Sequence, residues 1–168
     1  MLIRLTLLLV LTSFIIGCHL SAASPSREVA NSFSHVKLTT ASGDHSPIPL
    51  GNKLTVVNLF YEFSAGCPTG NRFEALERFH SLNPDAPIVL IFSGNQFSTQ
   101  DIDNFKAILP MPESLVQGDI EAVKPHLISG KLLVVLDSTG NVIWHERAGM
   151  SEQQVMSQVG ELLHSASR

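Results

Sequence analysis

The stretch that decides the fold is "VVNLFYEFSAGCPTG", residues 56–70, in which a hydrophobic run leads to a cysteine at the start of a helical pattern. The run belongs to residues 54–63, which are β-branched, aromatic and almost continuously apolar. This composition is typical of a strand buried on both faces. Residues 70–82 carry apolar side chains at spacings of three with charges between them, which predicts an amphipathic helix. Cys67 therefore stands at a predicted strand-to-helix junction.

The remaining residues alternate between strand and helix patterns. Capping boxes at "STQD" and "SEQQ" predict the starts of two further helices, and Asp119 is expected to cap a brief helix that Pro125 disturbs. Strands that alternate with helices imply a three-layer α/β/α sandwich with a central mixed sheet of four to five strands. The other predicted elements are strands at 35–40, 87–93, 131–137 and 141–146, and helices at 98–109 and from 151 onward.

The first residues read as an export signal. A short basic start is followed by an apolar run over residues 5–16, which is too short to span a bilayer as a helix. Two cleavage sites compete. In the first, "IIGC" at 15–18 resembles a bacterial lipobox, so residues 1–17 would be removed and Cys18 would be lipidated. In the second, "SAA" at 21–23 would end a secretory signal over residues 1–23.

Lipidation of Cys18 would attach the mature chain to a membrane surface without spanning it. Residues 18–34 are rich in Ser and Ala, and we predict a flexible tether there. Residues 35–168 then form one domain. The expected location is the bacterial cell envelope, either lipid-anchored or periplasmic or secreted.

Net charge and cysteine content restrict the partners and the disulfide chemistry that we expect of this protein. The formal net charge is −4 with a pI near 5.9, and no basic stripe is present, so we expect no nucleic-acid partner. The chain has two cysteines. An exported compartment permits disulfides. If Cys18 is lipidated or removed, however, Cys67 is the only remaining thiol, and no intrachain disulfide is expected.

Two stretches of the sequence resemble the thioredoxin-fold redoxins, especially the membrane-tethered thiol-disulfide proteins of the TlpA type. They are residues 56–70 and the downstream "GKLLVVLDSTGNVIWHERAGMSEQQV" (130–155). In that family a buried strand runs into W-C-x-x-C at a helix start, and a strand, a D-x-x-G turn, a strand and an amphipathic helix close the domain. The resemblance covers about residues 35–165. It implies a thioredoxin-like fold, a role in cell redox homeostasis and a reactive Cys67.

The sequence departs from this family at three positions. Gly70 replaces the second cysteine, and Gly66 replaces the preceding tryptophan. The family's cis-proline falls six residues before the turn aspartate, Asp137, and that position holds Lys131. These substitutions disfavour dithiol–disulfide exchange.

Peroxidases of the same fold offer a second comparison. Peroxiredoxins use P-x-x-x-[TS]-x-x-C, and Ser64 stands three residues before Cys67, although Phe60 replaces the proline. Ser64 and Thr69 are candidates to donate hydrogen bonds to the sulfur or to a bound peroxide. The alternative is that they cap the helix and stabilise the turn.

Cys67 is the candidate catalytic residue. The start of a helix presents unpaired N–H groups and the positive end of its dipole, which stabilise a thiolate. A single thiol can form a sulfenic acid or a mixed disulfide that an external thiol resolves. The alternative is an inert cysteine retained at an ancestral site.

Lys131 is the second candidate. The resemblance implies that its ammonium group lies near the Cys67 sulfur and favours the thiolate. Alternatively, Lys131 only opens a strand and points to solvent.

We expect neither a metal site nor a cofactor. The seven histidines include no pair spaced by three or four residues. Copper-delivery relatives of this fold use C-x-x-x-C, and Asn71 occupies the place of their second cysteine. Phosphate-binding loops and hydrolase motifs are absent from the sequence.

Two functions follow from the sequence. The first is an exported monothiol oxidoreductase or thiol peroxidase, whose partners are a small oxidant or a thiol protein. The second is a redox-inactive thioredoxin-fold lipoprotein that binds a partner in the envelope.

Overall fold

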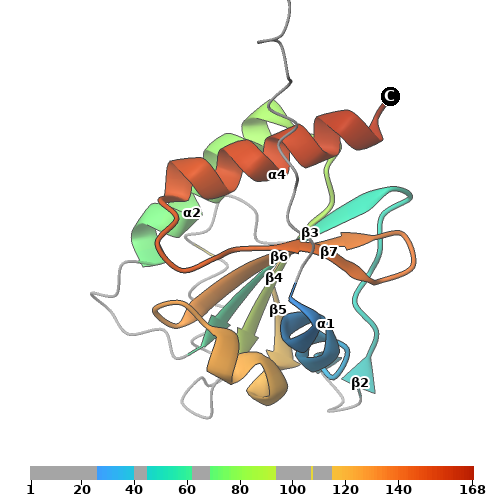
Figure 1. Ribbon diagram of the computed structural model, residues 1–168, viewed down its shortest axis with the longest axis vertical. Helices are drawn as coiled ribbons and strands as arrows, with labels where there is room; N and C mark the ends of the chain where they lie inside the picture. The colour runs from blue at the N-terminus through green and yellow to red at the C-terminus, as the bar shows by residue number, and fades with distance from the viewer. Residues whose placement is uncertain (1–25, 40–44, 62–68, 94–106, 108–114) are drawn as a thin grey trace, which may run out of the picture.

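The computed structural model describes residues 26–39, 45–61, 69–93, 107 and 115–168 (Figure 1). Several predictions fall on other parts of the chain and lie outside the described residues. These are the export signal, the helix at 98–109 apart from residue 107, and the residues Cys18, Ser64 and Cys67.

Within the described residues, the centre of the fold is a seven-stranded mixed sheet with the order β2-β1-β5-β4-β3-β6-β7. β3 pairs in parallel with β4 and antiparallel with β6, and β4 pairs in parallel with β5. The outer pairings are antiparallel. The strands are β1 (Lys37–Thr39), β2 (His45–Ser46), β3 (Leu54–Tyr61), β4 (Ile88–Ser93), β5 (Leu115–Asp119), β6 (Lys131–Asp137) and β7 (Val142–His145).

Helices cover both faces of this sheet (Figure 1). α2 (Thr69–Leu82) and α4 (Glu152–Ala166) lie side by side on one face. α1 (Arg27–Phe33) and the 3-10 helix η2 (Glu121–His126) lie on the other face. The arrangement confirms the predicted three-layer α/β/α sandwich with a mixed sheet. The expected number of four to five strands is wrong, because the short strands β2 and β5 also pair into the sheet.

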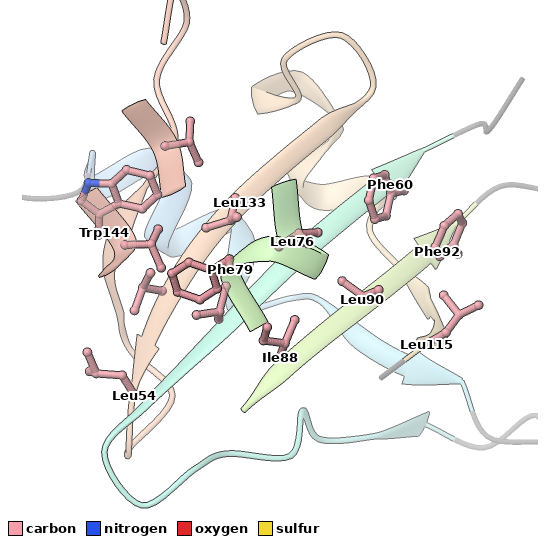
Figure 2. Packing of buried hydrophobic residues seen from close by; sticks show 14 residues of the cluster. Leu54, Phe60, Leu76, Phe79, Ile88, Leu90, Phe92, Leu115, Leu133 and Trp144 are labelled. Atoms are coloured by element: carbon pink, nitrogen blue, oxygen red, sulfur yellow. The ribbon is translucent and has the colours of Figure 1, made fainter. Parts of the chain in front are cut away.

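The strand β3 is the middle of the core, as its continuous apolar run predicts. Every residue from Leu54 to Phe60 is buried, because each face of the strand meets a layer of helices. On the α2 side, Leu76 and Phe79 point toward the strands (Figure 2). Near the carboxyl ends of β3 and β4, the ring of Phe60 stacks on Phe73 and on Phe92, each at a centroid distance of 4.8 Å.

The last helix forms as its capping box predicts. The Ser151 side chain accepts a hydrogen bond from Gln154 N at 3.2 Å, and Gln154 Oε1 accepts one from Ser151 N at 2.8 Å. These reciprocal bonds satisfy donors that the first turn of a helix leaves without partners. The buried residues Val155 and Val159 then face the sheet.

The predicted tether over residues 18–34 is wrong for its described part, residues 26–34. Ser26 caps α1 by accepting from Val29 N at 3.3 Å, and Val29 and Phe33 are each 4% exposed. Their spacing of four residues places both on one helix face, so the helix buries them against the sheet. The folded domain therefore begins at least nine residues earlier than the predicted boundary at residue 35.

The strand β5 was not predicted, because its sequence "LVQGD" is short and contains glycine. It forms as a parallel neighbour of β4 and an antiparallel neighbour of β1. A Cβ atom on Gly118 would lie 2.5 Å from Ile91 Cγ2 and 2.9 Å from the Lys37 carbonyl oxygen. Glycine is thus required here by close packing against both neighbouring strands.

Candidate functional site: a buried charge network at the start of helix α2

Arg72 organises the first turn of α2, the helix that begins two residues after Cys67 in the sequence. Arg72 precedes Leu76 by four residues, so both side chains lie on the helix face that meets the sheet. Both residues are 0% exposed. A fully buried guanidinium is costly unless it is paired with charges and hydrogen-bond acceptors.

Three acceptors from three other parts of the fold surround this guanidinium. Nη1 donates to Oδ1 of Asn58 in β3 at 2.7 Å. Nη2 donates to Oε1 of Glu146, directly after β7, at 2.7 Å. Nε donates to Oε2 of Glu152, the first residue of α4. One side chain therefore ties the start of α2 to the middle of the sheet, to the end of β7 and to α4.

Lys131 completes the network from the sheet. It is the first residue of β6, pairs with Phe60 of β3, and is 7% exposed. Its Nζ donates to Oε1 of Glu152. The sequence-based alternative that Lys131 points to solvent is wrong: it does open a strand, but its ammonium is held by a carboxylate. Its predicted proximity to Cys67 concerns a residue outside the described part of the chain.

Glu146 is held by both the side chain and the backbone of its neighbours. Besides the bond from Arg72, its Oε2 accepts from Leu133 N at 3.1 Å. Its own backbone N donates to the Leu133 carbonyl oxygen at 2.8 Å. With a side chain only 3% exposed, Glu146 needs these donors because a buried carboxylate without hydrogen-bond partners is costly.

Glu152 is the member of the network nearest to solvent, with a side chain 26% exposed. Burial acts to raise the pKa of this carboxyl, but hydrogen bonds from Arg72 and Lys131 and their positive charges outweigh burial and lower the pKa below its ordinary value. Glu152 is thus an anion that bridges two cations.

The network contains two positive and two negative groups, so its formal charge is balanced. A balanced, hydrogen-bonded cluster can fix the position of the first turn of α2.

The predicted site residues divide into two groups. Lys131 lies in the network, and Thr69 is the first residue of α2. Cys67, Ser64 and the lipidation candidate Cys18 lie outside the described residues.

Four members of the network were missed by the sequence analysis: Asn58, Arg72, Glu146 and Glu152. A signal was present for two of them. Arg72 shares the spacing of the apolar face of its helix, and Glu146 continues the alternation that buries Val142 and Trp144.

Two other features are relevant to function, namely metal-binding clusters and membrane-spanning helices. In the part of the chain that the structure describes, no three His, Cys, Asp or Glu side chains gather where they could hold a metal ion. Among the same residues, no helix is both long enough and apolar enough to cross a membrane.

Comparisons with known proteins support the fold. No protein-family model and no curated protein sequence matches the chain. Solved structures do match. A secreted Mycobacterium tuberculosis disulfide oxidoreductase homologous to Escherichia coli DsbE is 15% identical, with a TM-score of 0.51 over 82% of this chain and 99% of that protein.

Two other solved structures match in the same way. A thioredoxin-like protein in its oxidised form is 16% identical, with a TM-score of 0.52 over 70% of this chain and 82% of its own. Copper-bound yeast Sco1 is 12% identical, with a TM-score of 0.51 over 77% of this chain and 90% of its own. At these identities the likeness extends to the fold alone. The chain is a thioredoxin-fold protein.

Proposed function

We propose that this thioredoxin-fold protein carries out thiol redox chemistry in the cell envelope through a single reactive cysteine, Cys67. The observation that carries the proposal is the buried anchoring of the first turn of α2 by Arg72. Cys67 precedes this helix by two residues in the sequence. A rigidly held helix start offers fixed N–H groups and the positive end of the dipole to a thiolate.

The proposed reaction with a peroxide requires one thiol. The Cys67 thiolate attacks one peroxide oxygen, an S–O bond forms, and the O–O bond breaks. The sulfur is oxidised by two electrons to a sulfenic acid, and the departing oxygen takes a proton to leave as water or an alcohol.

An external thiol then returns Cys67 to its starting state. It attacks the sulfenic sulfur, water leaves, and a mixed disulfide forms. A second external thiol attacks this disulfide and releases Cys67 as a thiolate. Gly70 stands where a resolving cysteine would be, so both reducing equivalents come from outside the chain.

The deciding experiment is to treat the protein with a modest excess of hydrogen peroxide in the presence of dimedone and to locate the adduct by mass spectrometry. We expect an adduct on Cys67 in the wild type, none at this position in Cys67→Ser, and an unchanged yield in Cys18→Ser. Loss of the adduct after addition of a small thiol before dimedone would identify the reducible sulfenic acid. No adduct in the folded wild type would reject the proposal.

The alternative is a redox-inactive protein that uses the same fold to bind a partner in the envelope. The specific observation in its favour is the ion pair between Lys131 and Glu152. Because Glu152 balances the ammonium charge, Lys131 and Glu152 together carry no net positive charge that would favour a thiolate. This alternative stands if Cys67 gives no adduct.

The proposed location rests on the sequence of the first residues. We propose export to the cell envelope with a lipid on Cys18, which leaves the domain attached to the membrane surface.

A further inference from the structure

Two histidines contact α1, one at each end of the helix. Ser26, the N-cap, donates its backbone N–H to Nε2 of His145 in β7 at 3.1 Å. Ser32, in the last turn, has its Oγ 3.1 Å from Nε2 of His126 in η2. Between these contacts, Val29 and Phe33 pack into the core layer on that face of the sheet. α1 is therefore attached by one apolar face and two polar contacts.

The contact at His145 requires a neutral imidazole. Its Nδ1 lies 2.7 Å from the carbonyl oxygen of Glu146, which can only accept, so Nδ1 carries the hydrogen. Its Nε2 faces the backbone N–H of Ser26, which can only donate, so Nε2 must accept. Protonation of the ring would set two N–H groups against each other and break the contact.

The contact at His126 does not have this requirement. A serine hydroxyl can donate to a neutral imidazole or accept from a protonated one. The structure thus provides a matched pair of histidines on one helix, of which only His145 depends on its charge state.

The surroundings of His145 contain several charged groups. On α1 itself, Arg27 and Glu28 follow the N-cap. On β6 the residue opposite His145 is the apolar Val134. The carboxylate of Glu146 is already engaged by Arg72 and by Leu133 N. The charged or titratable residues of η2, which packs against α1, are Glu121, Lys124 and His126.

We infer that His145 forms a pH-sensitive contact with α1. When its imidazole is neutral, His145 holds the start of α1 on the domain, and when the imidazole is protonated, His145 releases it. Histidine is the side chain that most readily changes its charge between pH 5 and 8. A contact that needs the neutral ring is weakened when the ring binds a proton. Release of the start of α1 would uncover the part of the apolar layer that Val29 covers. This inference does not depend on the chemistry of Cys67.

Hydrogen–deuterium exchange of the full chain tests the role of His145. The exchange is analysed by mass spectrometry and corrected for intrinsic exchange rates. We expect the protection of α1 amides to fall about tenfold between pH 7.5 and pH 5.5 in the wild type. In His145→Gln, whose amide oxygen accepts without titrating, protection should be the same at both pH values. In His126→Gln the fall should persist.

Peptides from α4 serve as the internal reference, because α4 lies on the opposite face of the sheet from α1 (Figure 1). Their protection should not change between the two pH values in any variant. Equal α1 protection at both pH values in the wild type would overturn the inference. A fall that persists in His145→Gln would do the same.

If His145→Gln does not fold, the ring nitrogens of the wild type give an independent answer. Nitrogen-15 spectra at pH 7.5 should show His145 with hydrogen on Nδ1 and an unprotonated Nε2, and its titration should coincide with the loss of α1 protection. The opposite tautomer, or a titration that leaves α1 protection unchanged, would overturn the inference.

Discussion

Nη2 of Arg72 lies 2.7 Å from Oε1 of Glu146, and the two side chains are 0% and 3% exposed. The two residues are 74 positions apart in the sequence, so their contact joins α2 to the closing hairpin of the sheet. A buried ion pair adds little stability compared with a well-packed apolar pair, but removal of one partner leaves a buried charge without compensation.

The first prediction follows from this asymmetry. Arg72→Met should lower the free energy of unfolding by about 3–5 kcal/mol, because Glu146 loses its cation in the interior. Urea unfolding followed by the fluorescence of Trp144, the only tryptophan, measures the effect.

The matched control is Arg78→Met, at an exposed position of the same helix, which should change stability by no more than about 0.5 kcal/mol. If Arg72→Met costs less than about 1 kcal/mol while Arg78→Met behaves as expected, the network is not a structural anchor.

The second prediction concerns acid stability at the turn between β6 and β7. The pKa of Asp137 falls from 3.8 to about 2, because its carboxylate accepts hydrogen bonds from Thr139 and Asn141. The largest contribution comes from the side-chain hydroxyl of Thr139, and the next from the backbone N–H of Asn141. The folded state therefore binds the proton less readily than the unfolded state. The resulting stabilisation is complete above about pH 4 and is lost as the pH falls toward 2.

Asp137→Asn keeps one acceptor oxygen but does not titrate, so its stability should depend less steeply on pH than that of the wild type between pH 4 and 2. Thermal unfolding across this range is the measurement, and Asp85→Asn, at an exposed turn position, is the control. Parallel pH profiles for wild type and Asp137→Asn would contradict the prediction.

The third prediction separates the two charges that meet at Glu152. Lys131→Met should raise the pH midpoint of Cys67 alkylation, because the network becomes negative, and Glu152→Gln should lower it, because the network becomes positive. Each shift should be about one pH unit, which corresponds to an interaction of about 1.4 kcal/mol between the thiolate and a unit charge.

The readout is the rate of iodoacetamide labelling of Cys67 against pH. Lys53→Met, at the opposite end of β3, removes the same charge far from the start of α2 along the strand and should leave the midpoint unchanged. An unchanged midpoint in both Lys131→Met and Glu152→Gln would remove the network from the chemistry of Cys67.

The fourth prediction concerns the membrane. Cys18→Ser should move the protein from the membrane fraction to a soluble fraction, because the lipid is lost. Fractionation of cells followed by immunoblotting measures this. A wild-type protein that is already soluble would instead support cleavage after Ala23.

The sequence predicts the core elements of the fold because they carry strong local patterns. The apolar run that became β3 and the capping box that begins α4 are both recognisable without their neighbours. β5 is different. Its five residues become a strand through their pairing with β4 and β1, and that pairing depends on contacts distant in sequence.

The composition of the chain is a poor guide to its structure at the start of the domain. The Ser-rich stretch before residue 35 reads as a tether, yet Ser26 is a helix cap and the pair Val29 and Phe33 shares one helix face. A short helix of this kind is stable because it packs on the core, which a local pattern does not reveal.

The charge network could be predicted only in part. The position of Lys131 relative to Asp137 singles it out, whereas its partner Glu152 stands in the sequence only as part of a capping motif. Buried charged side chains are rare, so charged residues on a helix are ordinarily assigned to the solvent face. The network becomes visible only when β3, β7, α2 and α4 are brought together.

The docking of α1 also sets how far the domain can work from a membrane. With the lipid on Cys18, the folded part of the chain begins eight residues later, at Ser26, and a fully extended segment of that length spans at most about 28 Å. Were the start of α1 released up to Val29, the chain would reach about 40 Å. The first distance restricts encounters to molecules close to the bilayer surface, whereas the second admits partners held well away from it. Protonation of His145 would then change the distance from the membrane at which the domain can meet a partner.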